Sequence, residues 1–541
     1  MMFKSEKHNT NNTQYRRNKR KGTFLLLLTP ILIFLVVYCL IRQDYTPIKL
    51  YFNETPVINP PRIQGEFKLA QIHRHGTGEN FQMYQKLDVS PHFIEDAGDL
   101  FQMYKHQEEH TMDDEPDWPL NPNYQTLNPF DYSFKLSTTK ISMKRLDPKF
   151  VLSQLDMDKE YTKPVPDSLL QWFDDDDVVS PDVTNKETVI ALALMSSNAY
   201  VKIPHTGDWR NVTLPWNHSA SPGIGWNGDG IRGHVFYNDV ENIVVLSLKG
   251  TSAQGLPGSG IDETTANDKL NDNILFSCCC ARVSYLWTTA CDCFIKSNTC
   301  DETCLEKEVR RNDRYYKIAL DIFQQVELEY PNATMWLTGH SLGGALASLV
   351  GRTFGIPAVT FESPGEQLAA ERLHLPVPPG LPEYLEGIWH FGHTADPIFM
   401  GTCNGASSTC SIAGYAMETA CHTGRICVYD VVKDKGWYVN MLHHRIHTVI
   451  DDILTQYDSP ARCIEPEPCV DCYSWNFVRD INEPKKDKKK KNTKESSSLT
   501  TSSQSTIIST TKIKTTSSCI ARNWFGFCTE YGPIITFPTS H

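Results

Sequence analysis

The chain has 541 residues and a formal net charge of −12 at pH 7. This acidic balance provides no general basic surface, so nucleic acid is not an expected partner. Hydrophobic residues make up 40% of the chain, which indicates a folded protein with one large catalytic domain or two to three average domains.

The cysteines indicate an oxidising compartment. Of the 17 cysteines, Cys39 lies in an apolar stretch near the N-terminus, and the other 16 are clustered along the remaining chain. An even number in clusters favours disulfides. The alternative is zinc, because Cys469 and Cys472 have ligand spacing, but no second matched pair accompanies them. We expect disulfides, with no metal and no cofactor.

The N-terminus carries a predicted membrane anchor. Residues 1–23 form a basic tail, and Phe24 to Ile41 are 18 residues without a charge. As a helix they would span about 27 Å, close to the hydrocarbon thickness of a bilayer. The basic flank should stay in the cytosol, which makes the chain a single-pass type II membrane protein with its catalytic part in the lumen. The alternative is a cleaved signal peptide.

Four sequons for N-glycosylation agree with this orientation, since all of them follow the apolar stretch. Their asparagines are Asn53, Asn211, Asn217 and Asn332.

Residues 42–180 form a luminal N-terminal region with weak periodicity. His73 to Gly76 share the Arg-His-Gly triplet of histidine phosphatases, but the arginine and proline expected just downstream are absent, so we discount that function. Asp174 to Asp177 are four consecutive acids. They predict a solvated surface loop, with a weak calcium site as the alternative.

Residues 181–478 form the predicted catalytic domain, in which helices alternate with short apolar strands. This pattern predicts an α/β-hydrolase fold with a mainly parallel central sheet and disulfide-rich inserts. Helices are expected at 188–195, 312–330 and 448–457, and strands at 233–238, 242–248, 357–361 and 387–391.

The strongest motif of the domain is Gly339-His340-Ser341-Leu342-Gly343. An apolar strand precedes it and a helix rich in small residues follows. Glycines two residues on either side of the serine suit the sharp turn of a nucleophile elbow. The motif therefore predicts Ser341 as a catalytic nucleophile.

Candidates for the other catalytic roles follow along the chain. Asp396 precedes a proline at the end of a predicted strand, which suits the acid of a triad. His443, His444 and His447 compete for the base. The order Ser, Asp, His is that of α/β-hydrolases.

The oxyanion of the reaction needs hydrogen-bond donors beside the serine. The predicted donors are the backbone N–H of Leu342 and the backbone N–H and hydroxyl of Thr251, which follows the strand at 242–248. The insert from Ser252 to Asn312 is the candidate lid.

The chain ends in two segments of different composition. Residues 479–518 are first rich in lysine and then almost entirely serine and threonine, which predicts a disordered linker. Residues 519–541 contain Cys519 and Cys528 and are predicted to form a small tail.

Four motifs together resemble the fungal class 3 lipases. They are Lys249-Gly250-Thr251, Gly-His-Ser-Leu-Gly-Gly at the elbow, Phe361-Glu362-Ser363-Pro364-Gly365, and His393-Thr394-Ala395-Asp396-Pro397-Ile398. The anchor and residues 421–425 add a closer similarity to the vacuolar lipases of yeast autophagic bodies. The resemblance implies that the base is the histidine of His-Arg-Ile, which is His444. Lys249 and Thr251 replace the usual arginine and serine of the oxyanion turn.

The resemblance also implies a function and a location. The expected enzyme is a serine lipase or phospholipase that hydrolyses membrane phospholipids and acylglycerols through an acyl-enzyme. Its expected route runs from the endoplasmic reticulum and Golgi through the multivesicular body to the vacuole lumen. There it would lyse autophagic bodies and intravesicular membranes, with vacuolar proteases as activators. The alternatives are a carboxylesterase for soluble esters and an inactive lipase fold that binds lipid as an adaptor.

Overall fold

The computed structural model describes residues 65–96, 130–146, 172–201, 210–211, 230–252, 264–282, 289–377, 385–405 and 407–479, and four short strands between 514 and 537. The predicted anchor, Asn53 and Asn217 lie outside these residues. Within the described ranges, no helix has both the length and the apolar character needed to cross a bilayer. The chain divides into two compact units, Met1–Ile481 and Asn482–His541.

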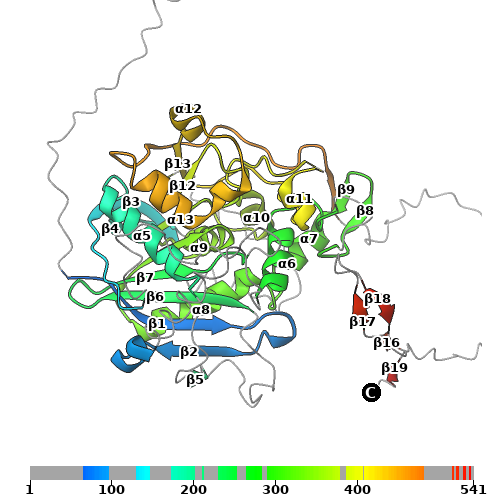
Figure 1. The fold of residues 1–541 in the computed structure, drawn as a ribbon, viewed down its shortest axis with the longest axis horizontal. Coiled ribbons are helices and arrows are strands. Elements are labelled where there is room, and N and C mark those ends of the chain that lie inside the picture. Colours follow the sequence, from blue (N-terminus) through cyan, green and yellow to red (C-terminus); the bar gives the residue numbers. More distant parts are fainter. Residues whose placement is uncertain are drawn as a thin grey trace, which may run out of the picture. The chain divides into compact units, whose positions relative to one another are not determined.

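A ten-stranded sheet forms the centre of the first unit (Figure 1). Its strand order is β14-β13-β12-β11-β10-β7-β6-β1-β2-β5. The pairings from β7 through β13 are parallel, and all the others are antiparallel. The sheet is therefore mixed, and the expected parallel arrangement is confirmed only for the half from β7 to β13. The strands are β1 (Lys68–His75), β2 (Tyr84–Asp88), β5 (Arg210–Asn211), β6 (Ile231–Asn238), β7 (Ile243–Leu248), β10 (Thr334–His340), β11 (Ala358–Phe361), β12 (Ile388–His393), β13 (Arg425–Tyr429) and β14 (Cys463–Ile464).

Helices cover both faces of this sheet and bury its apolar side chains. Alternate residues of β7 point to opposite faces, so Leu246 packs in one core with α8 (Tyr315–Glu329) and α9 (Leu342–Phe354). Val245 packs in the other core with α5 (Lys186–Asn198) and the helical turns around Ile450. The helices and strands expected from 188 to 391 are present within a few residues of their predicted bounds. The helix expected at 448–457 is instead a short α13 (Ile446–Thr448) and a π-helical segment (Val449–Leu454).

The prediction of a surface loop at Asp174 to Asp177 is wrong. These acids lie in β4 (Trp172–Pro181), which pairs antiparallel with β3 (Thr138–Leu146) in a separate two-stranded sheet. The facing strand supplies the compensating charges. Lys144 contacts Asp174 at 2.6 Å, Arg145 contacts Asp175 at 3.0 Å, and Lys140 contacts Asp177 at 2.8 Å. Lys144 is directly opposite Asp174 and the other two pairs are diagonal, and such cross-strand pairs of opposite charge make the acid run compatible with a sheet.

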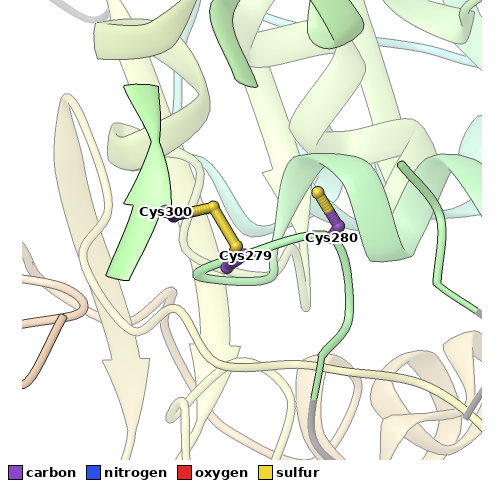
Figure 2. A group of neighbouring side chains, drawn as sticks. All are labelled: Cys279, Cys280 and Cys300. Carbon is purple, nitrogen blue, oxygen red and sulfur yellow. A yellow bond between two sulfur atoms is a disulfide. The ribbon is translucent and has the colours of Figure 1, made fainter. Parts of the chain in front are cut away.

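Seven disulfides brace the first unit, as the cysteine count predicts. The cysteine-dense insert carries α6 (Thr265–Leu275), β8 (Phe294–Lys296), β9 (Thr299–Asp301) and α7 (Glu302–Val309). Figure 2 shows one of its disulfides, between Cys279 and Cys300, beside Cys280. The disulfides are Cys278–Cys472, Cys279–Cys300, Cys280–Cys291, Cys293–Cys304, Cys403–Cys410, Cys421–Cys469 and Cys427–Cys463.

The disulfide pairing also bears on the zinc alternative. Cys469 and Cys472 belong to two different disulfides, so their thiolates are not available as a zinc ligand pair. The Cys278–Cys472 bond joins the insert to the end of the unit, across a sequence separation of 194 residues. Ser341, Asp396 and His444 all lie within the loop that it closes.

The remaining elements are short. In the first unit they are a 3-10 turn (Gly78–Asn80), α10 (Gln367–Arg372), α11 (Thr409–Ala413), α12 (Val431–Lys435), a 3-10 turn (Met441–His444) and β15 (Asn476–Val478). In the second unit, β16 (Lys514–Thr516) pairs with β19 (Ile535–Phe537), and β17 (Cys519–Arg522) pairs with β18 (Cys528–Tyr531), both antiparallel. β16 falls within the stretch that the sequence predicts to be a linker.

Candidate active site

Ser341 lies at the apex of a sharp turn between β10 and α9. Its backbone has φ 57° and ψ −132°, a strained conformation for a residue with a side chain. Close packing explains the flanking glycines. A Cβ at Gly339 would lie 2.5 Å from the backbone of Gly343, and a Cβ at Gly343 would lie 2.1 Å from the carbonyl oxygen of Leu248. The predicted nucleophile elbow is therefore present in the fold.

His444 connects Ser341 to Asp396. Its Nε2 lies 2.8 Å from Ser341 Oγ, and its Nδ1 lies 2.7 Å from Asp396 Oδ2. Burial disfavours the charged form of Asp396, but the neighbouring imidazole of His444 lowers the pKa of Asp396 well below its ordinary value. The ionised carboxylate only accepts hydrogen bonds, so Nδ1 of His444 carries the proton. Nε2 is then free to accept the hydroxyl proton of Ser341.

The other two candidate histidines occupy different places. His443 stacks on Trp437, with ring centroids 4.4 Å apart, and its carbonyl oxygen accepts a hydrogen bond from His393 Nε2 at 3.0 Å. His447 lies on α13, beyond the turn that carries His444. Of the three, His444 is the one that the structure places between Ser341 and Asp396.

His340, the variable residue of the elbow, has a role that the sequence did not predict. Its Nε2 lies 2.7 Å from the carbonyl oxygen of His444, and its Nδ1 lies 2.9 Å from the hydroxyl of Tyr200. Burial, with a smaller effect of the nearby His444, lowers the pKa of His340 to about 3, so the ring stays neutral. Because a carbonyl only accepts, Nε2 donates to it and Nδ1 accepts from Tyr200. His340 thus links α5 and its C-terminal turn to the backbone of His444.

The predicted oxyanion donors lie on two adjoining turns. Leu342 is the first residue of α9, and the first N–H groups of a helix have no partner within it. The neighbouring turn is close, since a Cβ at Gly250 would lie 3.2 Å from Ser341 Cβ. The hydroxyl of Thr251 donates to Asp272 Oδ2 at 2.7 Å, so it is engaged away from the predicted role. The backbone N–H of Thr251 is the group left for that role.

Two acids of α6, in the insert, contact the turn that carries Lys249 and Thr251. Buried Lys249 donates from Nζ to Thr264 Oγ1 at 3.0 Å and lies 3.5 Å from Asp268 Oδ2. Asp272 accepts the hydrogen bond from the hydroxyl of Thr251, as described above. Burial, with the nearby charge of Asp268, raises the pKa of Asp272 to about 8. The described part of the insert therefore positions the turn beside Ser341.

Glu362 is a second buried acid beside the triad. It follows β11 with φ 46° and is completely buried, and its Oε1 lies 3.7 Å from His393 Nε2. Burial and the charge of Asp396 raise the pKa of Glu362 well above its ordinary value. Of these two neighbouring acids, one is therefore neutral and the other charged. In the sequence, Glu362 stands out only as part of the motif from Phe361 to Gly365.

Two of the four sequons fall on described residues. Asn332 is exposed in the turn between α8 and β10, with φ 68°, so a glycan on its side chain would extend into solvent. Asn211 lies in the short edge strand β5. Glycosylation at both stays a prediction.

Comparison with known proteins adds relatives along almost the whole chain. The family model "Lipase (class 3)" matches residues 290–355, which include Ser341. The "Putative lipase ATG15" of Saccharomyces cerevisiae is 57% identical over 509 residues, covering 93% of this chain and 96% of that protein. The protein with the same name from Vanderwaltozyma polyspora is 52% identical over 551 residues, covering 95% and 96%.

Solved structures show weaker similarity. The Lip2 lipase of Yarrowia lipolytica has 15% identity and a TM-score of 0.22, and covers 44% of this chain and 76% of its own. Lipase II from Rhizopus niveus has 17% identity and a TM-score of 0.19, and the match covers 37% of this chain and 61% of that lipase.

Proposed function

This chain belongs to the ATG15 family of fungal class 3 lipases, and from that premise we propose that it hydrolyses ester bonds of membrane lipids through an acyl-enzyme on Ser341. The observation that carries the proposal is the continuous hydrogen-bonded chain Ser341–His444–Asp396 at a strained elbow. These three residues stand in the order and the geometry of a hydrolase triad.

The proposed reaction follows from the protonation states of the site. His444 Nε2 takes the proton of Ser341 while Oγ attacks the ester carbonyl carbon. The backbone N–H groups of Leu342 and Thr251 then stabilise the oxyanion. His444 returns the proton to the leaving alcohol, and Asp396 stabilises the imidazolium in between. Water attacks the acyl-enzyme by the same route, releases the fatty acid and restores Ser341.

Phospholipids and acylglycerols of autophagic bodies and multivesicular-body vesicles are the proposed substrates. Residues 24–41 would anchor the protein to these vesicles on its way to the vacuole, so that the enzyme arrives on its own substrate. The support for these substrates and this route is the apolar stretch of the sequence and the names of the relatives.

The test compares the full chain with Ser341→Ala on liposomes of mixed phospholipid and triglyceride at vacuolar pH. Fatty acid release that disappears in the variant supports the proposal and ranks the lipids. His444→Ala should lose activity by orders of magnitude, whereas His443→Ala is the matched control and should keep it within a few-fold. Release of acid from soluble esters only would overturn the lipid assignment. Lipid hydrolysis that survives in Ser341→Ala would overturn the acyl-enzyme.

A further inference from the structure

A second cluster of titratable groups lies outside the proposed triad. Glu366 follows β11, His390 lies in β12, and His422 precedes β13. Glu366 and His390 are completely buried, and His422 is 8% exposed. None of the three takes part in the proposed acyl transfer, so the cluster calls for an explanation independent of that reaction.

The spacing of the donor atoms suits a metal ion. His390 Nε2 lies 3.1 Å from Glu366 Oε1, and His422 Nδ1 lies 3.5 Å from Glu366 Oε2. One ligand atom of each residue lies within 4.8 Å of the other two. Metal–ligand bonds of about 2.0–2.1 Å in a tetrahedral site place neighbouring donor atoms about 3.3–3.4 Å apart. The separations in the structure bracket this value, because they run from 3.1 Å to no more than 4.8 Å.

The hydrogen bond on the far side of His422 fixes its tautomer. Its Nε2 lies 3.0 Å from the carbonyl oxygen of Phe399, which only accepts, so Nε2 carries the proton. In the neutral ring Nδ1 then presents a lone pair toward Glu366 Oε2. Neither of these two atoms has a hydrogen-bond partner among the described residues, and both are buried. Two acceptors that face each other in a buried site are unfavourable unless a proton or a metal ion lies between them.

His390 and Glu366 are oriented in the same way. Nδ1 of His390 lies 2.7 Å from Thr360 Oγ1, while its Nε2 faces the carboxylate without a hydrogen bond. Oε1 of Glu366 accepts from Ser348 Oγ at 2.8 Å and from Thr423 Oγ1 at 2.5 Å, which leaves Oε2 free for a ligand role. Metal-binding histidines and carboxylates are typically held by such hydrogen bonds to their outer atoms.

We propose that Glu366, His390 and His422 bind one Zn²⁺ ion. Two imidazole nitrogens and one carboxylate oxygen suit zinc, whereas calcium and magnesium prefer ligand sets made of oxygen alone. A water molecule would complete the tetrahedron. The ion would join the loop after β11, strand β12 and the segment before β13. Because β12 leads directly to Asp396, the ion would also fix the position of the triad acid.

The test measures metal content and stability on the full chain, purified without a histidine tag. After dialysis against trace zinc, elemental analysis should find about one zinc per chain. Glu366→Gln and His422→Gln should reduce this content at least tenfold. His234→Gln is the matched control, because His234 is a buried histidine that bonds Asn198 outside the cluster. It should keep its zinc.

Two further readouts do not depend on the variants. EDTA should lower the Tm of the wild type by about 5 °C, because a ligand at 100 times its Kd stabilises by about 2.7 kcal/mol. Cobalt in place of zinc should give visible absorption bands of a four-coordinate site. Folded wild type with no bound zinc, no cobalt bands and a Tm insensitive to EDTA would overturn the proposal. Zinc that remains in both variants would overturn the assigned ligands.

Discussion

The bridge from Tyr200 through His340 to the backbone of His444 makes a quantitative prediction about activity. His340→Leu keeps most of the side-chain volume but removes both hydrogen bonds. The carbonyl oxygen of His444 would then be buried without a donor, at a cost of about 1–3 kcal/mol. If this cost raises the free energy of the conformation in which His444 is aligned for proton transfer, kcat falls by about 5-fold to 150-fold. KM should change little, because substrate is not expected to contact the bridge.

Two related variants separate the bonds of the bridge. Tyr200→Phe removes only the donor to Nδ1 and should cost about 0.5–1.5 kcal/mol, or about 2-fold to 10-fold in kcat. His340→Gln offers an amide N–H in place of the Nε2 proton, so it should recover part of the activity that His340→Leu loses. The double variant with Tyr200→Phe should be no worse than His340→Leu alone, because both changes disrupt one bridge.

The assay is steady-state hydrolysis of a soluble short-chain ester, with circular dichroism to show that each variant is folded. The pH profile is informative as well. Because His340 stays neutral down to a pH of about 3, the acidic limb of kcat/KM should keep its position in Tyr200→Phe. A folded His340→Leu with kcat within twofold of the wild type would refute the argument that the bridge positions the base.

Three other changes test the surroundings of the site. Gly250→Ala would put a methyl group 2.1 Å from the hydroxyl of Tyr200, so kcat should fall at least about tenfold by forcing the oxyanion turn away. Burial raises the pKa of Asp272 from 3.8 to about 8. Between these values Asp272 stays neutral in the folded chain but ionises in the unfolded chain. Its contribution to the free energy of unfolding is therefore complete below about pH 3.8 and is lost as the pH rises toward 8. Asp272→Asn should therefore flatten the fall in Tm across that range. Replacing Cys278 and Cys472 by serine opens a loop with a separation of 194 residues and should cost up to about 5 kcal/mol in the free energy of unfolding.

Each of these has a clear contrary result. Wild-type kcat in Gly250→Ala would show that the turn does not depend on close packing against Tyr200. A Tm profile for Asp272→Asn that is parallel to the wild type from pH 4 to 8 would mean that Asp272 titrates equally in the folded and unfolded chain. For the disulfide, the matched control is the loop of separation 7 closed by Cys403 and Cys410. Equal losses from both would rule out an effect of loop length.

The elbow and the position of Asp396 could be predicted because their signals are local. Gly339, Ser341 and Gly343 stand within five residues, and their steric requirement is met by the strand and helix around them. The choice between His443 and His444 could not be made from the residues alone. Both lie on one 3-10 turn, and only the fold shows that their rings face different surroundings. The family resemblance singled out His444, and the geometry places the same residue between Ser341 and Asp396.

The strands before residue 181 could not be predicted from the sequence because polar or charged side chains interrupt their apolar patterns. β1 carries buried His73 and His75, whose polar side chains hide the apolar pattern of a central strand. β4 carries Asp174 to Asp177, whose charges are balanced only by the strand opposite. Thr251 was expected to use its hydroxyl at the oxyanion, but its acceptor Asp272 comes from the insert 21 residues later. The even number of cysteines outside the apolar stretch predicted disulfides, but the sequence did not show which cysteines pair with each other.

The bond between Cys278 and Cys472 has a further consequence for a chain that meets proteases. Ser341, Asp396 and His444 all lie between these two cysteines, so a single peptide cleavage anywhere in that interval opens the loop without releasing a fragment. Both new ends remain in one covalent molecule, and none of the three residues can diffuse away from the others. Cuts before Cys278 or after Cys472 can shed flanking segments and still leave this ring intact. A nicked form of the protein would therefore run as one species on a nonreducing gel and as two after reduction.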